Sequence, residues 1–186
     1  MAMPSVDYLA ILKTLRRHGV DFVIVGGVCA VLHGAPIATF DLDVVHSREP
    51  NNLARLMAAL EELDARHRIP GRREKRPGPS HLAPRDRLTC HSERSEESRS
   101  ESRGLASHQL LTTCFGPLDL LGTIGKGRDY GQLLDEAVEL EIGGGLKVRV
   151  STLASLVKTK EETGQEKDRA VLPVLRRLLE EKTRQT

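Results

Sequence analysis

The feature that most constrains this chain is a glycine pair, Gly26-Gly27, followed by two aspartates in the tripeptide Asp41-Leu42-Asp43. Side chains of a β-strand alternate between the two faces of the sheet, so Asp41 and Asp43 point to the same side. The opposite face of this strand points into a core and holds Phe40, Leu42 and Val44. Two carboxylates on one face repel each other, and a hard divalent cation such as Mg²⁺ is the usual reason for keeping them together. The tripeptide therefore predicts a strand that carries metal ligands.

The glycine pair itself follows an apolar run, Phe22 to Val25, that indicates a short buried strand. Apolar residues from Val28 to Leu32 come next, which is typical of the start of a helix. Backbone N–H groups at such a junction suit phosphate oxygens. A glycine pair alone is more often a simple turn, and an Asp-x-Asp alone is commonly a solvated strand face. Their combination predicts a metal-assisted nucleotidyl-transfer site.

A third carboxylate, Asp119, stands in an apolar run between Leu118 and Leu120. An unpaired carboxylate is costly to bury in such a strand, so Asp119 needs a partner. A cation already held by Asp41 and Asp43 would serve. We therefore expect Asp119 to join the same metal site.

Length and composition exclude several classes of protein. A chain of 186 residues builds one core, with room for a small second lobe. Lys and Arg number 28 against 26 Asp and Glu, so the whole chain is not a polyelectrolyte binder of nucleic acid. The chain has no Trp, 3 Phe and 2 Tyr, which argues against modules that stack RNA bases on exposed aromatic rings.

The cysteine pattern and the hydropathy bear on cellular location. Cys29, Cys90 and Cys114 lack paired spacing, and no apolar run approaches the roughly 20 residues that span a bilayer. The N-terminus has no hydrophobic export core after a basic cluster. We expect a soluble, reduced, cytoplasmic protein that makes no contact with a membrane.

Hydrophobic periodicity predicts helices and strands along most of the chain. A first helix, which Ser5 caps and Gly19 ends, has one apolar face formed by Val6, Leu9, Leu12 and Leu15. The other expected elements are a strand over Thr39–Val45, a helix from Asn52 to Leu63, strands over Gln109–Phe115 and Leu118–Gly122 with a tight turn at Gly116-Pro117, a helix over Asp129–Ala137, a hairpin of Val138–Ile142 and Leu146–Val150, and helices over Leu153–Glu162 and Asp168–Lys182.

The segment from Arg66 to Arg87 interrupts this order. It holds eight Lys or Arg and four Pro, and it has too little apolar surface to order itself well. Residues 90–103, which are mostly Ser, Glu and Arg, resemble the short peptides that arise when dispersed bacterial repeat DNA is read in frame. We interpret residues 66–107 as a disordered insertion, with a regulatory or RNA-contacting loop as the alternative.

These residues together carry a resemblance to a known family. The glycine pair after Val25, the pair Asp41 and Asp43, and the later lone Asp119 resemble the pattern of the DNA-polymerase-β-type nucleotidyltransferase superfamily. Several flanking motifs are similar to small bacterial nucleotidyltransferases, including the AbiEii-like toxin group. These motifs are His33-Gly34, Thr39–Asp43, Gly127–Tyr130, Leu156–Lys160 and Lys167-Asp168. The resemblance covers residues 5–65 and 108–182 and skips the insertion.

The resemblance implies an α+β nucleotidyltransferase fold, in which a mixed sheet is flanked by helices. It divides the chain into a core over residues 1–65 and 108–150, the insertion over 66–107, and a C-terminal helical extension over 151–186. It also implies that three catalytic residues, Asp41, Asp43 and Asp119, hold two Mg²⁺ ions, with Mn²⁺ as an alternative. Asp119 is in addition the candidate general base.

Nucleotide binding is implied in the same way. Gly26 and Gly27 position the β and γ phosphates of an NTP, and Lys160, with Lys158 or Lys167 as weaker candidates, neutralises phosphate charge. Two departures from the family's pattern weaken the case for phosphate binding. Many relatives have Ser where this chain has Gly27, and a basic residue where it has Ile37-Ala38.

Three functions remain open from the sequence. The first is a Mg²⁺-dependent enzyme that moves a nucleoside monophosphate from an NTP to an acceptor hydroxyl on RNA, a protein or a small molecule, with a small cognate antitoxin or toxin as a partner. The second is a catalytically degenerate protein of the same fold that binds a nucleotide or a partner. The third is a nucleic-acid-binding module that uses residues 66–87. The intact aspartate trio favours the first.

Histidines and one Cys-His pair have simpler explanations than ligation. His33 is more often a structural histidine than a ligand. His46 is either a secondary contact of the aspartates or a surface residue at the end of a strand. Cys90-His91 lacks a second pair at the spacing that zinc requires.

Overall fold

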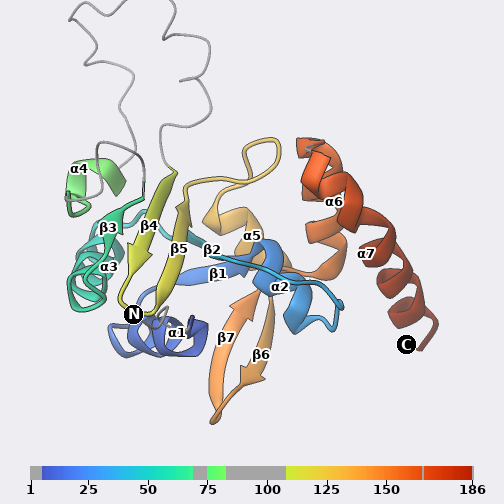
Figure 1. Cartoon of the computed structure of the whole chain (residues 1–186), viewed down its shortest axis with the longest axis horizontal. Coiled ribbons are helices and arrows are strands. Elements are labelled where there is room, and N and C mark those ends of the chain that lie inside the picture. The colour runs from blue at the N-terminus through green and yellow to red at the C-terminus, as the bar shows by residue number, and fades with distance from the viewer. Residues whose placement is uncertain (1–5, 69–74, 83–107, 165, 186) are drawn as a thin grey trace, which may run out of the picture.

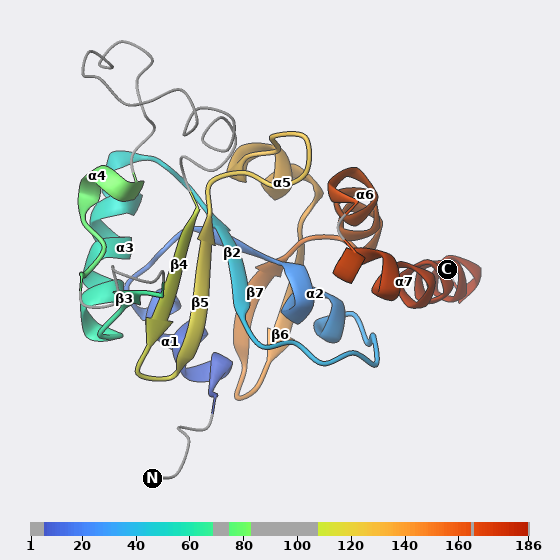
Figure 2. The same cartoon turned by 45° about the horizontal axis from the view of Figure 1, so that its top comes forward.

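The computed structural model describes residues 6–68, 75–82, 108–164 and 166–185. Within these ranges the chain forms one mixed seven-stranded sheet in the order β3-β4-β5-β2-β1-β7-β6, with helices packed around it (Figure 1, Figure 2). The strands are β1 (Phe22–Val25), β2 (Leu42–His46), β3 (Arg66–His67), β4 (Gln109–Thr113), β5 (Gly116–Leu121), β6 (Val138–Ile142) and β7 (Leu146–Val150). The helices are α1 (Tyr8–Arg17), α2 (Gly26–Leu32), α3 (Pro50–Glu62), α4 (Pro79–Leu82), α5 (Tyr130–Glu136), α6 (Leu153–Thr163) and α7 (Glu166–Gln185). The predicted α+β class is confirmed.

The sheet packs its apolar side chains on two faces. On one face, Val44 and Leu120 are buried in the main core, together with residues of α1, α3 and the C-terminal helices. On the other face a smaller apolar cluster forms against α5. It consists of Val23, Val25, Val45 and Leu133. Asp43 and Asp119 directly precede Val44 and Leu120, so alternation puts both carboxylates on the α5 face.

The register at the centre of the sheet fixes the positions of these aspartates. Strand β2 is antiparallel to β1, where Asp43 pairs with Val25, and parallel to β5, where Asp43 pairs with Asp119. The two carboxylates therefore lie side by side on neighbouring strands, although Asp43 and Asp119 are 76 positions apart in the sequence.

The predicted strand over Thr39–Val45 is right in its second half and wrong at its start. Strand β2 begins only at Leu42, after a bend at Phe40 and Asp41. Alternation does not extend through a bend, so Phe40 does not enter the core and its exposure is 82%. Leu42 and Val44, on the predicted apolar face of the strand, are buried as expected.

The first helix begins later than predicted. Its cap residue is Asp7, whose carboxylate accepts a hydrogen bond from the N–H of Ala10 at 2.9 Å, and not Ser5. Val6 precedes the helix and is largely exposed, so it does not belong to the buried face, which is formed by Ile11, Leu12 and Leu15. Gly19, with a φ of +68°, ends the element as predicted.

The turn between β4 and β5 is displaced from its predicted position. The sequence places it at Gly116-Pro117, but these two residues already form the start of β5 and pair with β4. The turn residues are Cys114 and Phe115. The hydroxyl of Thr113 organises this turn, because it accepts from the N–H of Phe115 at 3.1 Å and donates to the carbonyl of Gly116 at 2.7 Å.

The ordered fold extends past residue 65, where the sequence predicts the insertion to begin. Residues Arg66 and His67 form β3, which pairs with β4, and His67 is buried. Leu82 of the short helix α4 is also buried in the main core. Pairing with a distant strand supplies the stabilisation that this charged stretch lacks locally. Residues 69–74 and 83–107, including the Ser-Glu-Arg tract and Cys90-His91, lie outside the described residues.

Two helices close the chain, as predicted. Gly164, with a φ of +60°, separates α6 from α7, and the two helices lie side by side at the far side of the molecule from α3 (Figure 1). Pro173 is accommodated inside α7, between the buried residues Leu172 and Leu175. Among the described residues, no helix has the length and apolar character needed to cross a membrane.

Candidate active site

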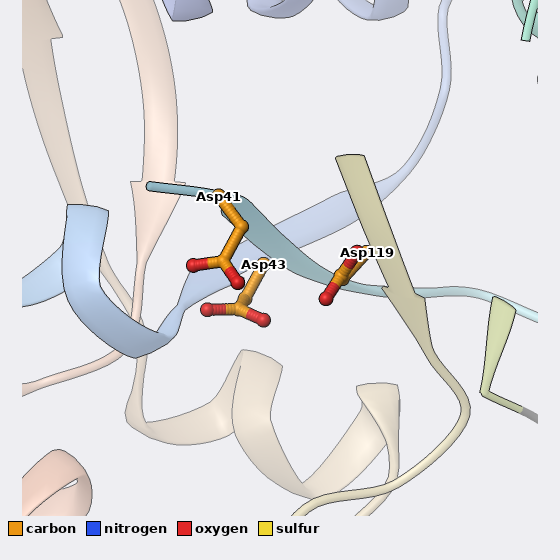
Figure 3. A group of neighbouring side chains, drawn as sticks. All are labelled: Asp41, Asp43 and Asp119. Atoms are coloured by element: carbon orange, nitrogen blue, oxygen red, sulfur yellow. The ribbon is translucent and has the colours of Figure 1, made fainter. Parts of the chain in front are cut away.

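Three carboxylates converge at the centre of the sheet. Asp41 lies just before β2, Asp43 on β2 and Asp119 on β5, and Figure 3 shows their side chains grouped on one side of these strands. Each offers an oxygen, and these oxygens all lie within 4.8 Å of one another. Asp119 is buried, with 6% of its surface exposed, and the other two are half-buried. The arrangement brings together the three carboxylates that the sequence predicts as metal ligands.

The negative charge of the three carboxylates affects a neighbouring side chain, Tyr8. Burial raises the pKa of Tyr8 above its usual value, and the carboxylates of Asp41 and Asp43 raise it further. The hydroxyl of Tyr8 is shielded from solvent. A divalent cation at the trio would offset this concentration of like charge.

Gly26 allows the backbone to approach the trio closely. Its φ is +65°, a conformation that residues with a Cβ adopt at a cost. A Cβ at this position would also lie 1.9 Å from Oδ2 of Asp43. Both the backbone angle and the close approach therefore require glycine. In contrast to the predicted helix start at Val28, Gly26 is already the first residue of α2.

Gly27 is packed in a similar way against Thr39. A Cβ at Gly27 would lie 2.2 Å from Oγ1 of Thr39. That hydroxyl donates to the carbonyl of Asp41 at 3.2 Å and so ties the bend before β2 to the glycine turn. Thr39 belongs to the motif Thr39–Asp43, but the sequence analysis predicts no role for its side chain. Its position two residues before Asp41 is the signal that could have indicated one.

The trio and the glycine turn line one side of a pocket of about 580 Å³, which is within the usual size range of small-ligand sites. Residues of α6 and α7 also line this pocket, among them Lys160 and Asp168. Apolar residues of several elements also line the pocket. They are Ile37, Leu121, Ile124, Leu156 and Val171. The exposed ring of Phe40 also lines the pocket.

The three candidate lysines differ in their positions. Lys160 lines the pocket, where its Nζ lies 2.6 Å from Oδ1 of Asp168. The hydroxyl of Thr163 donates to the other oxygen of that carboxylate at 2.8 Å, which fixes the pair. Lys158 is exposed and is not among the described residues that line the pocket. Lys167 is part of α7, but its side chain lies outside the described atoms.

The loop between β5 and α5 also lines the pocket. Gly125 lines the pocket, and the N–H of Lys126 donates to Glu162 of α6 at 3.1 Å. Arg128 forms an ion pair with Glu162 at 3.5 Å and donates to the hydroxyl of Ser155 at 2.8 Å. The motif Gly127–Tyr130 therefore serves to attach this loop to α6, and Asp129 caps α5.

One basic residue at the trio was not predicted as a site residue. Arg68 follows β3, and its Nη2 lies 2.6 Å from Oδ1 of Asp119. The sequence places Arg68 inside the charged segment that it predicts to be disordered. Nothing in the local sequence distinguishes it from the neighbouring arginines, because its position depends on the pairing of β3 with β4.

The two histidines near the site have structural contacts. The Nε2–H of His33 donates to the carbonyl of Ser151 at 2.8 Å, in agreement with the structural role that the sequence favours. His46 is 1% exposed, so the alternative of a surface histidine is wrong. Burial lowers the pKa of His46, and its Nδ1 contacts the carbonyl of Ser47 at 3.0 Å.

Comparison with known proteins decides the fold. No protein-family model matches this sequence, and no curated protein matches it. A crystal structure from Thermotoga maritima, described as that of "a putative nucleotidyltransferase", is similar over 94% of this chain and 91% of that chain, with a TM-score of 0.51 and 15% sequence identity. The chain has a nucleotidyltransferase-like fold. At this identity the similarity establishes the fold alone, and the AbiEii-like subtype stays a prediction.

Proposed function

We propose that this chain is a metal-dependent nucleotidyltransferase that moves a nucleoside monophosphate from an NTP to an acceptor hydroxyl. The observation that carries the proposal is the convergence of Asp41, Asp43 and Asp119 beside the glycine turn, in a pocket large enough for a small ligand. The nucleotidyltransferase-like fold adds support.

The trio fits Mg²⁺ or Mn²⁺. All three side chains offer carboxylate oxygens, which both ions prefer, and the oxygens are close enough to share a cation. In this proposal Asp41, Asp43 and Asp119 hold the metal. Bound divalent ions would stabilise negative charge on the attacking and leaving oxygens of a phosphoryl transfer.

The chain's own residues would then act as follows. The acceptor oxygen forms a bond to the α-phosphorus of the NTP while the bond to the β-phosphate oxygen breaks, so pyrophosphate leaves. Asp119 accepts the proton of the acceptor hydroxyl as general base. The N–H groups of Gly26 and Gly27 are the proposed donors to the β and γ phosphates, because these two residues begin α2 and line the pocket together with the trio.

The remaining residues of the pocket have proposed roles in binding the phosphates and the base of the nucleotide. Lys160 is the proposed phosphate-neutralising lysine, because it lines the pocket, whereas Lys158 and Lys167 are weaker candidates. The apolar residues of the pocket suit the flat faces of a base, and the exposed ring of Phe40 at the rim is available for stacking.

Two alternatives differ from this proposal in testable ways. A catalytically degenerate protein of the same fold would bind a nucleotide without transferring it, and the complete aspartate trio favours the enzyme over this alternative. A nucleic-acid-binding module would use the basic residues 66–87, only part of which lie in the described ranges. RNA, a protein side chain and a small molecule are all candidate acceptors, and a cognate toxin or antitoxin is the candidate protein partner.

The proposal predicts that the purified protein transfers label from an α-³²P-labelled NTP to an RNA or protein acceptor in a bacterial lysate when Mg²⁺ is present. Chelation of divalent ions with EDTA is expected to stop the transfer, and added Mg²⁺ or Mn²⁺ to restore it. Label incorporation is measured after electrophoresis, and the acceptor is identified by mass spectrometry. Transfer that continues at an unchanged rate in EDTA would contradict the proposed chemistry, and nucleotide binding without transfer to any acceptor would favour the degenerate alternative.

A further inference from the structure

Arg68 forms an ion pair with the most buried member of the aspartate trio. Its Nη2 lies 2.6 Å from Oδ1 of Asp119, and the side chains of the two residues are 33% and 8% exposed. The distance is that of a strong, charge-assisted hydrogen bond. The backbone of Arg68 is fixed independently, because its N–H donates to the carbonyl of Leu110 at 2.8 Å. The guanidinium is thus held at the trio by the end of β3.

The order of strands places this guanidinium opposite the glycine turn. Strand β5 carries Asp119 and lies between β2, which carries Asp43, and β4, which pairs with β3 and so positions Arg68. The carboxylate of Asp119 therefore has negative neighbours toward β2 and a positive neighbour toward β3. A cation that binds the trio has to share this carboxylate with Arg68.

We propose that Arg68 is a positioning residue that holds Asp119 in the metal-free site and competes with the metal ion for it. This inference rests on the proposed function, because it takes the trio as the metal site. Arg68 then sets the metal affinity of the site. A fixed positive charge beside the trio keeps its affinity for a free divalent ion low, and the negative phosphates of a bound NTP offset that charge. Arg68 thereby favours the binding of metal together with nucleotide over the binding of metal alone.

Removing the charge of Arg68 should therefore tighten the binding of a divalent ion. Arg68→Gln keeps a hydrogen-bond donor of similar reach and leaves the backbone bond to Leu110 in place. We expect the Kd for Mn²⁺, without nucleotide, to fall about tenfold, which corresponds to about 1.4 kcal/mol. Arg68→Lys keeps the charge and is expected to bind Mn²⁺ with a Kd within about threefold of the wild type.

The measurement is a titration with Mn²⁺ in which the free ion is followed by electron paramagnetic resonance. Arg66→Gln is the matched control, because Arg66 lies two residues before Arg68, in β3, and its ion pair, at 3.2 Å, is with the half-exposed Asp64 instead of the trio. It is expected to bind Mn²⁺ as the wild type does. In an Asp119→Asn background, Arg68→Gln is expected to change the Kd by much less than tenfold, because the partner charge is gone.

The possible outcomes separate this inference from the proposed function. If Asp43→Asn weakens the binding of Mn²⁺ but Arg68→Gln leaves it unchanged or weakens it, the proposed role of Arg68 is overturned. The trio is then still supported as the metal site. Absence of Mn²⁺ binding by the wild type and by Arg68→Gln overturns both. If Arg66→Gln lowers the Kd for Mn²⁺ as much as Arg68→Gln does, the effect comes from the net charge of the protein. That result would also overturn the inference. Circular dichroism of each variant checks that the fold is retained.

Discussion

Replacing Asp43 by Asn is expected to lower the rate of nucleoside monophosphate transfer by about 1,000-fold or more, equivalent to roughly 4 kcal/mol of transition-state stabilisation. Asp43 pairs with Asp119 across β2 and β5 and lies next to Gly26, so it links the metal ligands to the glycine turn. Asn has the same shape but lacks the charge that a divalent cation requires. The rate is measured as label transferred from an α-³²P-labelled NTP in the presence of Mg²⁺.

Asp135→Asn is the matched control for this change. Asp135 is an exposed residue of α5, on the same face of the sheet as the trio, and the substitution removes the same charge. It is expected to transfer label at the wild-type rate. If Asp43→Asn keeps its fold and more than a tenth of the wild-type rate, Asp43 is not a metal ligand of the reaction.

Gly26→Ala is expected to have the second-largest effect, on both stability and metal binding. The new alanine would have to adopt a φ of +65°, and its Cβ would lie 1.9 Å from Oδ2 of Asp43. The backbone angle alone costs about 1–2 kcal/mol, and the overlap forces the carboxylate of Asp43 away from its neighbours. We expect a lower free energy of unfolding in urea, by roughly 2 kcal/mol or more, and the loss of detectable Mn²⁺ binding.

Gly34→Ala separates these two causes. Gly34 also has a positive φ, of +95°, but a Cβ at this position would have no atom within 4 Å. The substitution is expected to reduce stability by about 1–2 kcal/mol, from the backbone angle alone, and to leave Mn²⁺ binding unchanged. Equal effects of the two substitutions on Mn²⁺ binding would show that the approach of Gly26 to Asp43 does not matter to the site.

The elements that the sequence predicts correctly are those with a local signal. Leu56 and Leu60 of α3 repeat at helical spacing and are buried in the main core. The hairpin of β6 and β7 alternates around its glycines and forms with the predicted bounds. The three aspartates are brought together as expected, because parallel pairing of β2 with β5 places Asp43 beside Asp119.

The errors occur where distant contacts decide the structure. Phe40 is assigned to the core by alternation, but the bend before β2 removes it from the strand. Arg66 and His67 have a composition that predicts disorder, yet pairing with β4 makes them a strand. Arg68 consequently reaches Asp119, a contact between residues 51 positions apart that no local pattern indicates. The role of the insertion beyond residue 82 stays a prediction.

X-ray diffraction from crystals grown with Mn²⁺ and a non-hydrolysable NTP analogue, with data collected at the manganese absorption edge, would locate the metal and the nucleotide directly. We expect anomalous peaks between the carboxylates of Asp41, Asp43 and Asp119 and the phosphates of the analogue. The β and γ phosphates should contact the N–H groups of Gly26 and Gly27. A nucleotide bound elsewhere, or manganese bound without contact to any of the three aspartates, would contradict the proposed metal and nucleotide site.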